Sequence, residues 1–88
     1  MTLYSAMVEV SLRPGIADPQ GTTIERALPA LGFKNISGVR TGKAFRLAVD
    51  APDEASARGE VQALCDKLLS NPVIEQASVT IEVLESSR

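Results

Sequence analysis

The sequence contains few side chains with the chemistry of a catalyst. Its one thiol, Cys65, has no imidazole to activate it, because the 88 residues include no histidine. Cys65 also lies on the apolar side of a predicted helix, which favours a buried and unreactive thiol. Two carboxylates, Glu9 and Glu82, fall on the outward faces of predicted strands and would need a shared pocket to act as an acid and a base. We therefore expect no catalytic residue in this chain.

Sites for metals and nucleotides are also missing from the sequence. With one cysteine and no histidine, the common ligand sets for zinc and haem cannot be assembled. Residues 39–43, VRTGK, contain a single glycine and do not follow the GxxxxGK[ST] pattern that cradles phosphates. We expect the chain itself to hold no metal and no nucleotide cofactor.

Basic residues gather around this segment. Arg40, Lys43 and Arg46 would suit a phosphate or the carboxylate of a partner protein. Charges on an edge strand also prevent aggregation, and this second interpretation is equally compatible with the pattern.

Two loops add polar groups that a partner protein could contact. The segment DPQG, residues 18–21, could bind an anion at a helix N-terminus, but its own negative aspartate favours helix capping. The segment NPVIE, residues 71–75, is either a recognition loop or the end of a helix before a strand. The residues predicted to contact partners are Asp18, Gln20, Arg40, Lys43, Asn71 and Pro72.

Charge and composition exclude several classes of partner. The net charge is −2 and the sequence has three aromatic residues, whereas nucleic-acid-binding proteins carry a basic face and aromatics that stack on bases. No apolar run approaches the roughly 20 residues that span a bilayer. The first residues do not resemble a signal peptide, and one cysteine fits a reducing compartment, so we expect a cytoplasmic protein.

The size of the chain predicts one domain that self-associates. Residues 1–88 are enough for a single small core, with a flexible tail expected at about 85–88. No disulfide can reinforce this core, and small domains without such reinforcement often gain stability by forming oligomers.

The stretch 18–32 predicts an amphipathic helix. Two starts are possible: Asp18 as N-cap with Pro19 at the first position, or a capping box of Thr22 and Glu25. Pro29 should bend or loosen the last turn, and Gly32 suits the left-handed residue that follows a helix. One apolar stripe, which we expect a sheet of the same chain to cover, consists of Ile24, Ala27, Leu28 and Leu31.

Alternating apolar residues predict four strands. The strands are expected at 3–12, 33–40, 44–49 and 75–84, the second and third forming a hairpin with a bulge at Gly38. A second helix is predicted to begin near 50–54 and to end at Asn71 and Pro72. Its core stripe contains Ala57, Val61, Leu64, Cys65 and Leu68.

The order β-α-β-β-α-β predicts an α+β fold of the split β-α-β, ferredoxin-like type. In this fold a four-stranded antiparallel sheet carries two helices on one face. Either the uncovered face or the edge strands would then pair with a second chain.

Three segments together resemble the PurS family. They are DPQG followed by I-x-x-A-L-x-x-L-G-F (18–33), VRTGK (39–43) and CDKLLSNPVIE (65–75), in register over nearly the whole chain. PurS is the small subunit of bacterial and archaeal phosphoribosylformylglycinamidine (FGAM) synthase, a glutamine- and ATP-dependent ligase complex of purine (IMP) biosynthesis.

The resemblance implies an accessory role. The complex uses ATP, Mg²⁺ and glutamine, which are handled by a synthetase subunit (PurL) and a glutaminase subunit (PurQ). A chain similar to PurS would be non-catalytic, would form a homodimer or a dimer of dimers, and would bridge the other two subunits so that ammonia passes between them.

Two alternative hypotheses are compatible with the predicted fold. One is an ACT-like regulatory module that binds a small molecule between subunits. The other is an acylphosphatase-like hydrolase, but its phosphate loop would have to use Arg13, where the adjacent Pro14 removes a needed N–H donor.

Overall fold

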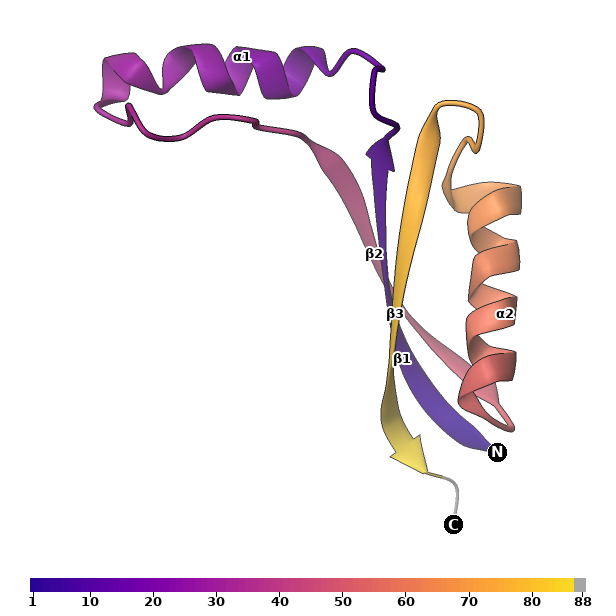
Figure 1. Ribbon diagram of the computed structural model, residues 1–88. Helices are drawn as coiled ribbons and strands as arrows, with labels where there is room; N and C mark the ends of the chain where they lie inside the picture. Colours follow the sequence, from indigo (N-terminus) through magenta and orange to yellow (C-terminus); the bar gives the residue numbers. More distant parts are fainter. Residues whose placement is uncertain (87–88) are drawn as a thin grey trace.

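Three strands and two helices make up the described part of the chain (Figure 1). The computed structural model describes residues 1–86. The elements, in order, are β1 (Thr2–Leu12), α1 (Pro19–Ala27), a 3₁₀ turn (Pro29–Leu31), β2 (Gly42–Ala51), α2 (Glu54–Leu64), a π-helical turn (Cys65–Leu69) and β3 (Glu75–Ser86). Of the tail expected at 85–88, residues 85 and 86 continue β3, and 87–88 lie outside the described residues.

The three strands form one antiparallel sheet in the order β2-β1-β3. The central strand β1 places Val8 opposite Phe45 of β2 and opposite Val79 of β3. The alternation predicted for β1 is confirmed, because Val8 and Val10 are buried while Glu9 between them is exposed. A β-bulge interrupts the pairing with β3 between Leu3 and Tyr4.

Helix α2 covers one face of this sheet and closes the core. Asp53 caps it by accepting a hydrogen bond from the Ser56 N–H at 2.7 Å. Ala57, Val61 and Cys65 recur at i, i+4 and i+8 and are fully buried against the strands. The π-helical turn widens the last turn of this helix. Leu69 therefore packs on the core in place of the predicted Leu68, which is 74% exposed.

The burial of Cys65 leads to a test of its predicted inertness. Burial raises the pKa of the Cys65 thiol above its usual value of 9.0, and the neighbouring Asp66 raises it further. We expect a thiol reagent to modify the native chain roughly a hundredfold more slowly than the unfolded chain, since modification requires local opening. The measurement is the rate of thiol titration with and without denaturant, and equal rates would contradict the buried position.

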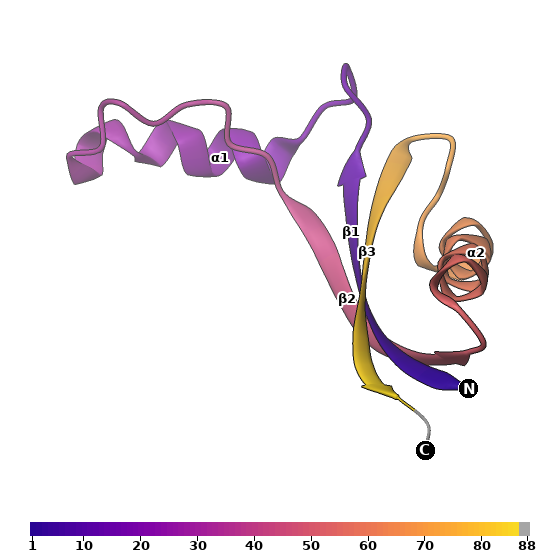
Figure 2. The ribbon, with the colours of Figure 1, turned by 60° about the horizontal axis from the view of Figure 1, so that its bottom comes forward.

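The predicted four-stranded sheet is wrong. Residues 33–40 form no strand but run beside α1 as an irregular segment (Figures 1 and 2). They do not form the predicted hairpin with β2, an edge strand of the sheet, because the Val39 and Thr41 N–H groups donate to the Glu25 and Asp18 carboxylates and hold this segment to the first helical stretch. Gly38, predicted as a strand bulge, has φ +70° and turns this segment in the left-handed region. The fold remains α+β, with three strands.

The predicted placement of both helices on one face is also wrong. We call residues 18–41 the arm; it contains α1, the 3₁₀ turn and the returning segment, and projects away from the sheet (Figure 2). Its local structure follows the first of the two predicted starts, with Asp18 as N-cap and Pro19 in the first turn. Pro29 ends the α-helix early in a 3₁₀ turn, and Gly32 has φ +93° as predicted.

The arm makes the molecule long and thin. The radius of gyration is 16.9 Å, whereas a compact domain of this length has one of about 12 Å. The apolar stripe of α1 is therefore not covered by its own sheet, contrary to expectation: Ile24 is 43% exposed and Leu31 69%. Neither α1 nor α2 is long and apolar enough to cross a membrane.

Candidate partner-contact site at the base of the arm

Polar residues from four segments meet where the arm joins the sheet. At this end β1 finishes and the other strands begin, with Ser11 opposite Gly42 and Leu12 opposite Glu75. All six residues predicted to contact partners lie on these segments or just beyond them. We call the following set the corner: Arg13, Asp18, Gln20, Arg40, Thr41, Lys43, Asn71, Pro72 and Glu75.

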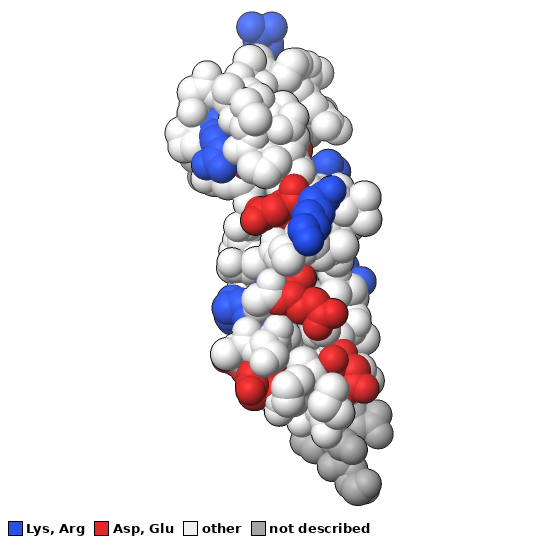
Figure 3. All heavy atoms as spheres, turned by 90° about the vertical axis from the view of Figure 1, so that its right-hand side faces the viewer, with Lys and Arg blue, Asp and Glu red and all other residues white. Residues whose placement is uncertain are grey.

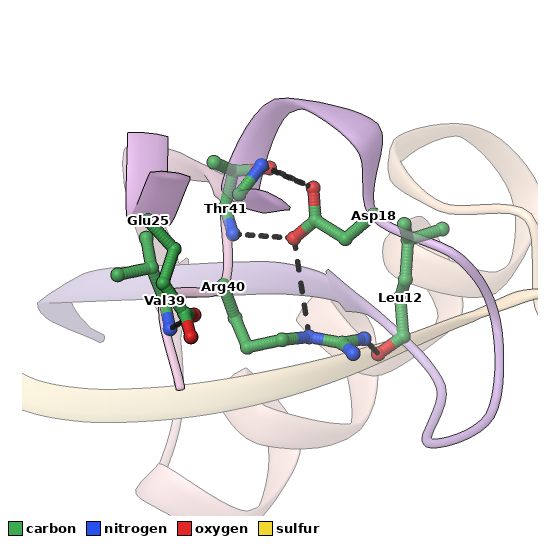
Figure 4. Close-up of polar contacts among 7 residues, drawn as sticks. Leu12, Asp18, Glu25, Val39, Arg40 and Thr41 are labelled. Atoms are coloured by element: carbon green, nitrogen blue, oxygen red, sulfur yellow. Dashed lines mark hydrogen bonds and ion pairs between the residues drawn. The ribbon is translucent and has the colours of Figure 1, made fainter. Parts of the chain in front are cut away.

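Asp18 is the centre of the corner and is only 7% exposed (Figure 4). Its Oδ1 accepts hydrogen bonds from the Gly21 N–H and the Thr41 hydroxyl, both at 2.9 Å. Its Oδ2 accepts one from the Thr41 N–H at 2.7 Å and lies 3.9 Å from the Arg40 Nε. Asp18 thus caps α1 and also holds the returning chain against the start of that helix.

Two further contacts fix the returning segment (Figure 4). The Glu25 Oε1 accepts a hydrogen bond from the Val39 N–H at 2.9 Å, and Arg40 donates to the Leu12 carbonyl at 3.2 Å. Gly21 allows this close approach, because a Cβ there would lie 2.5 Å from the Val39 oxygen. The sequence pattern indicated Glu25 only as a possible capping-box residue, whereas the residue that it binds, Val39, lies fourteen positions away.

The other half of the corner joins β2 to the loop before β3. Lys43 Nζ lies 3.7 Å from Glu75 Oε2, while Glu75 Oε1 accepts a hydrogen bond from the Asn71 N–H at 2.7 Å. Arg13 donates from Nε to the Pro72 carbonyl at 2.9 Å. Glu75 therefore links two of the predicted contact residues, Lys43 and Asn71.

Between the two halves lies an open hollow of about 230 Å³. Gln20, Thr41, Lys43 and Glu75 line it together with the ends of β1 and β2. Sequence reasoning missed Arg13, Thr41 and Glu75 as corner residues, because the types of these residues do not reveal which distant segments the sheet register brings together.

Other predicted candidates lie elsewhere. Arg46 is opposite Met7 in the middle of the sheet and does not belong to the corner. Glu82 is opposite Ser5, four residues along β1 from Glu9, so the two carboxylates are separated by about 13 Å along the strand. At this distance Glu9 and Glu82 cannot act together as an acid and base pair.

The charges of the described residues do not suggest an alternative site. The face that carries α2 shows acidic and basic side chains interspersed with uncharged ones (Figure 3). Among residues 1–86, no group of three or more metal-ligating side chains comes together.

The geometry around Asp18 predicts a pH-dependent arm. Hydrogen bonds from the backbone N–H groups of Thr41 and Gly21 hold the pKa of Asp18 below its usual value of 3.8, although burial acts in the opposite direction. The stabilisation by this carboxylate is present above pH of about 4 and is lost as the pH falls through the lowered pKa.

We therefore expect amide exchange at Thr41, corrected for intrinsic rates, to accelerate at strongly acidic pH. In an Asp18→Asn variant Thr41 should exchange fast at every pH, whereas an Asp53→Asn variant, altered at the other helix cap, should keep the wild-type profile. A Thr41 profile that does not change in Asp18→Asn would disprove the role of this carboxylate.

Comparison with known proteins identifies the family. The model of the PurS family, described as phosphoribosylformylglycinamidine (FGAM) synthase, matches residues 5–83. The chain belongs to the PurS family. The resemblance inferred from the three sequence segments is thereby confirmed, and the protein is assigned to FGAM synthase of purine biosynthesis.

Relatives match the chain over nearly its full length. The PurS subunit of FGAM synthase from Synechocystis is 42% identical over 84 residues, covering 96% of this chain and 84% of that protein. The subunit from Methanocaldococcus jannaschii is 39% identical over 83 residues, covering 94% of this chain and all of that protein.

Solved PurS structures share the fold. PurS of M. jannaschii, one of the subunits of formylglycinamide ribonucleotide amidotransferase, superposes with a TM-score of 0.83 over 93% of this chain and 99% of that one. The PurLQS structure from Thermotoga maritima contains a chain that is 34% identical, with a TM-score of 0.85 over 93% of this chain and all of that one. The family match favours the accessory-subunit interpretation over the ACT-like and acylphosphatase-like alternatives.

Proposed function

We propose that this chain is the non-catalytic accessory subunit of FGAM synthase that joins a synthetase subunit of the PurL type to a glutaminase subunit of the PurQ type. The similarity to the PurS chain of the T. maritima PurLQS structure is the observation that carries this proposal. In this role the chain self-associates, works in the cytoplasm and keeps ammonia from escaping while it passes between its partners.

We further propose that ATP, Mg²⁺ and glutamine are bound by the partners and not by this chain. The sequence supports this division of labour, since a glutaminase needs a thiol with an imidazole to activate it and the chain has no histidine. An ATP site needs a phosphate cradle, and the VRTGK segment does not provide one.

The corner is the surface that we assign to these partners. Asp18 is fully used in holding the arm, and it positions the exposed groups beside it rather than contacting a partner directly. Gln20 and Lys43 line the open hollow, and the Lys43 side chain is 57% exposed. Asn71 and Pro72 lie on the exposed loop that Glu75 and Arg13 anchor.

Reconstitution of the complex tests the accessory role. Turnover of the synthetase with free ammonia should persist without this chain, while turnover with glutamine should fall by at least about tenfold, because ammonia delivered through solution is diluted. The two substrates are compared with and without the chain in otherwise identical mixtures. Glutamine-dependent turnover that is unaffected by omission would refute the accessory role.

A charge reversal then tests the corner. Lys43→Glu should weaken binding to the partners by roughly tenfold, the effect of losing one well-placed charged contact at an interface. Glu54→Lys, a reversal at the far end of the sheet where α2 begins, should leave binding unchanged. Equal affinities of the two variants for the partners would show that the corner does not belong to the interface. The accessory role would still stand.

A further inference from the structure

A second open hollow lies where α2 ends and β3 begins (Figure 1). We call it the α2–β3 hollow; its volume is about 220 Å³. It adjoins the corner, because Arg13, Pro72 and Glu75 belong to both. Small-molecule sites in proteins are concave and combine an apolar surface with a few polar groups. The α2–β3 hollow has this composition, without an accumulation of one charge.

The floor of the α2–β3 hollow is apolar. Ala77 lies opposite the buried Val10 of β1, so its side chain points to the same face of the sheet as α2. Val79 follows two residues later on this face. Cys65 closes the floor from the helix and is only 2% exposed. An apolar group of a ligand would be removed from water on this floor.

Arg13 forms the wall of the hollow on the side of the corner. Its backbone N–H donates to the Ile74 carbonyl at 2.8 Å, and its Nε donates to the Pro72 carbonyl at 2.9 Å. These bonds fix the side chain, which has no ion pair within residues 1–86. A guanidinium held in this way presents N–H donors that suit a carboxylate.

The wall formed by the helix favours a positive charge. Asp66 lines the hollow from the π-helical turn and has no ion pair within the described residues. This turn follows the C-terminal end of α2, where the helix dipole attracts cations. Single π-helical turns are rare and are often found at functional sites. The remaining charged residue of the lining, Glu75, already binds Lys43 and the Asn71 N–H.

We propose that the α2–β3 hollow binds a small α-amino acid with an apolar side chain. The carboxylate of the ligand binds Arg13, its ammonium group lies toward Asp66, and its side chain rests on Ala77. A ligand with only a negative charge would be repelled by Asp66, and one with only a positive charge by Arg13. The balanced lining therefore selects a zwitterion. This ligand site goes beyond the accessory role.

Binding of L-valine to the intact chain tests the site. An NMR titration that follows the backbone amides should show shifts around the hollow and none along the arm. The expected Kd is about 1 mM, which is typical of about eight non-hydrogen atoms in an open site. Isovalerate lacks the ammonium group of L-valine and isobutylamine lacks its carboxylate. Each should bind at least tenfold more weakly than L-valine.

Variants with matched controls locate the ligand. Asp66→Asn and Arg13→Gln should each weaken binding of L-valine at least fivefold, whereas Glu60→Gln removes a carboxylate from α2 outside the hollow and should not. Ala77→Leu fills the floor and should abolish binding. Ser78→Leu adds the same side chain to the other face of β3 and should leave binding unchanged. Asp66 and Ala77 make no side-chain hydrogen bond within the described residues, so their variants should fold.

The ligand should also steady the loop before β3. This loop carries Asn71 and Pro72 of the corner, and the resulting link to the partner surface rests on the proposed function. The Glu75 N–H donates to the Asn71 carbonyl at 2.8 Å. With L-valine at ten times its Kd, hydrogen exchange of this N–H should slow roughly tenfold, because the loop cannot open until the ligand leaves. Unchanged exchange would separate the ligand site from the corner.

Three results would overturn the site. They are no binding of L-alanine, L-valine or L-leucine at about 10 mM, isovalerate binding as tightly as L-valine, and an Ala77→Leu variant that binds like the wild type. All three are measured on the intact chain without partner subunits. A failed ligand site would therefore leave the accessory role to the reconstitution of glutamine-dependent turnover, and a failed reconstitution would leave the ligand site standing.

Discussion

Replacing Asp18 with alanine is expected to release the arm and to reduce glutamine-dependent turnover of the reconstituted complex by roughly tenfold or more. The variant leaves the Gly21 and Thr41 N–H groups without their acceptor in a mostly buried place. An unsatisfied buried donor costs enough free energy to shift the equilibrium between the held and the released arm by about tenfold. The corner then loses the alignment of Gln20 with Lys43 across the hollow. Ammonia-dependent turnover should not change, because the proposed division of labour gives that reaction to the synthetase subunit alone.

The second N-cap of the chain provides the matched control for Asp18. Asp53 caps α2 through one hydrogen bond to the Ser56 N–H and makes no contact with the arm. Asp53→Ala should therefore lower the melting temperature by a few degrees, as loss of a cap does, and keep glutamine-dependent turnover close to that of the wild type. If both variants lose turnover equally, the effect of Asp18 arises from general stability and not from the arm.

Replacing Val61 with aspartate is expected to unfold the chain. Val61 is 1% exposed between α2 and the sheet, and a carboxylate there would have no partner. Burying such a group costs roughly 4 kcal/mol or more, against a total stability of about 5 to 15 kcal/mol for a small domain. The loss should appear in far-ultraviolet circular dichroism and in the fluorescence of Tyr4, the only tyrosine of a chain without tryptophan, which is buried in the native state.

The exposed face of the same helix provides the control for Val61. Ala63→Asp introduces the same side chain two residues further along α2, where it points to solvent. Its cost should stay near 0.5 kcal/mol, the usual effect of a surface substitution in a helix. A cooperative unfolding transition of normal midpoint in Val61→Asp would contradict the position of α2 on the sheet.

The sequence alone determined the local structure of several elements, because the signals for these elements are contained within a few residues. Alternation of apolar residues identified β1 and the burial of Val8 and Val10. Asp18, Pro19 and Gly32 predicted where the first helical stretch starts and ends. In each case the determining interaction is a side chain bonding to or shaping its own backbone, so no distant residue had to be known.

Strand pairing required the tertiary structure. Residues 33–40 have an apolar pattern that any extended segment tolerates, and strand pairing depends on which acceptors compete for the N–H groups of the segment. The predicted hairpin partner, β2, is an edge strand, but the Val39 and Thr41 N–H groups donate to Glu25 and Asp18 instead, so this segment stays beside α1 and the predicted fourth strand does not form. Since these acceptors lie 14 and 23 residues away in the chain, a local apolar pattern carries no information about them.

For the candidate site, too, the sequence indicated individual residues and the tertiary structure decided which of them meet. The sequence indicated Asp18, Gln20, Arg40, Lys43, Asn71 and Pro72 through loops, charges and helix ends, and it indicated that no thiol and imidazole pair exists. Only the tertiary structure brought Thr41 to Asp18 and Glu75 to Lys43, because the register of β1 with its two neighbours sets which loops meet. The direction of the arm was likewise decided by hydrogen bonds between residues more than ten positions apart, which is why the apolar stripe that was assigned to the chain's own sheet remains exposed.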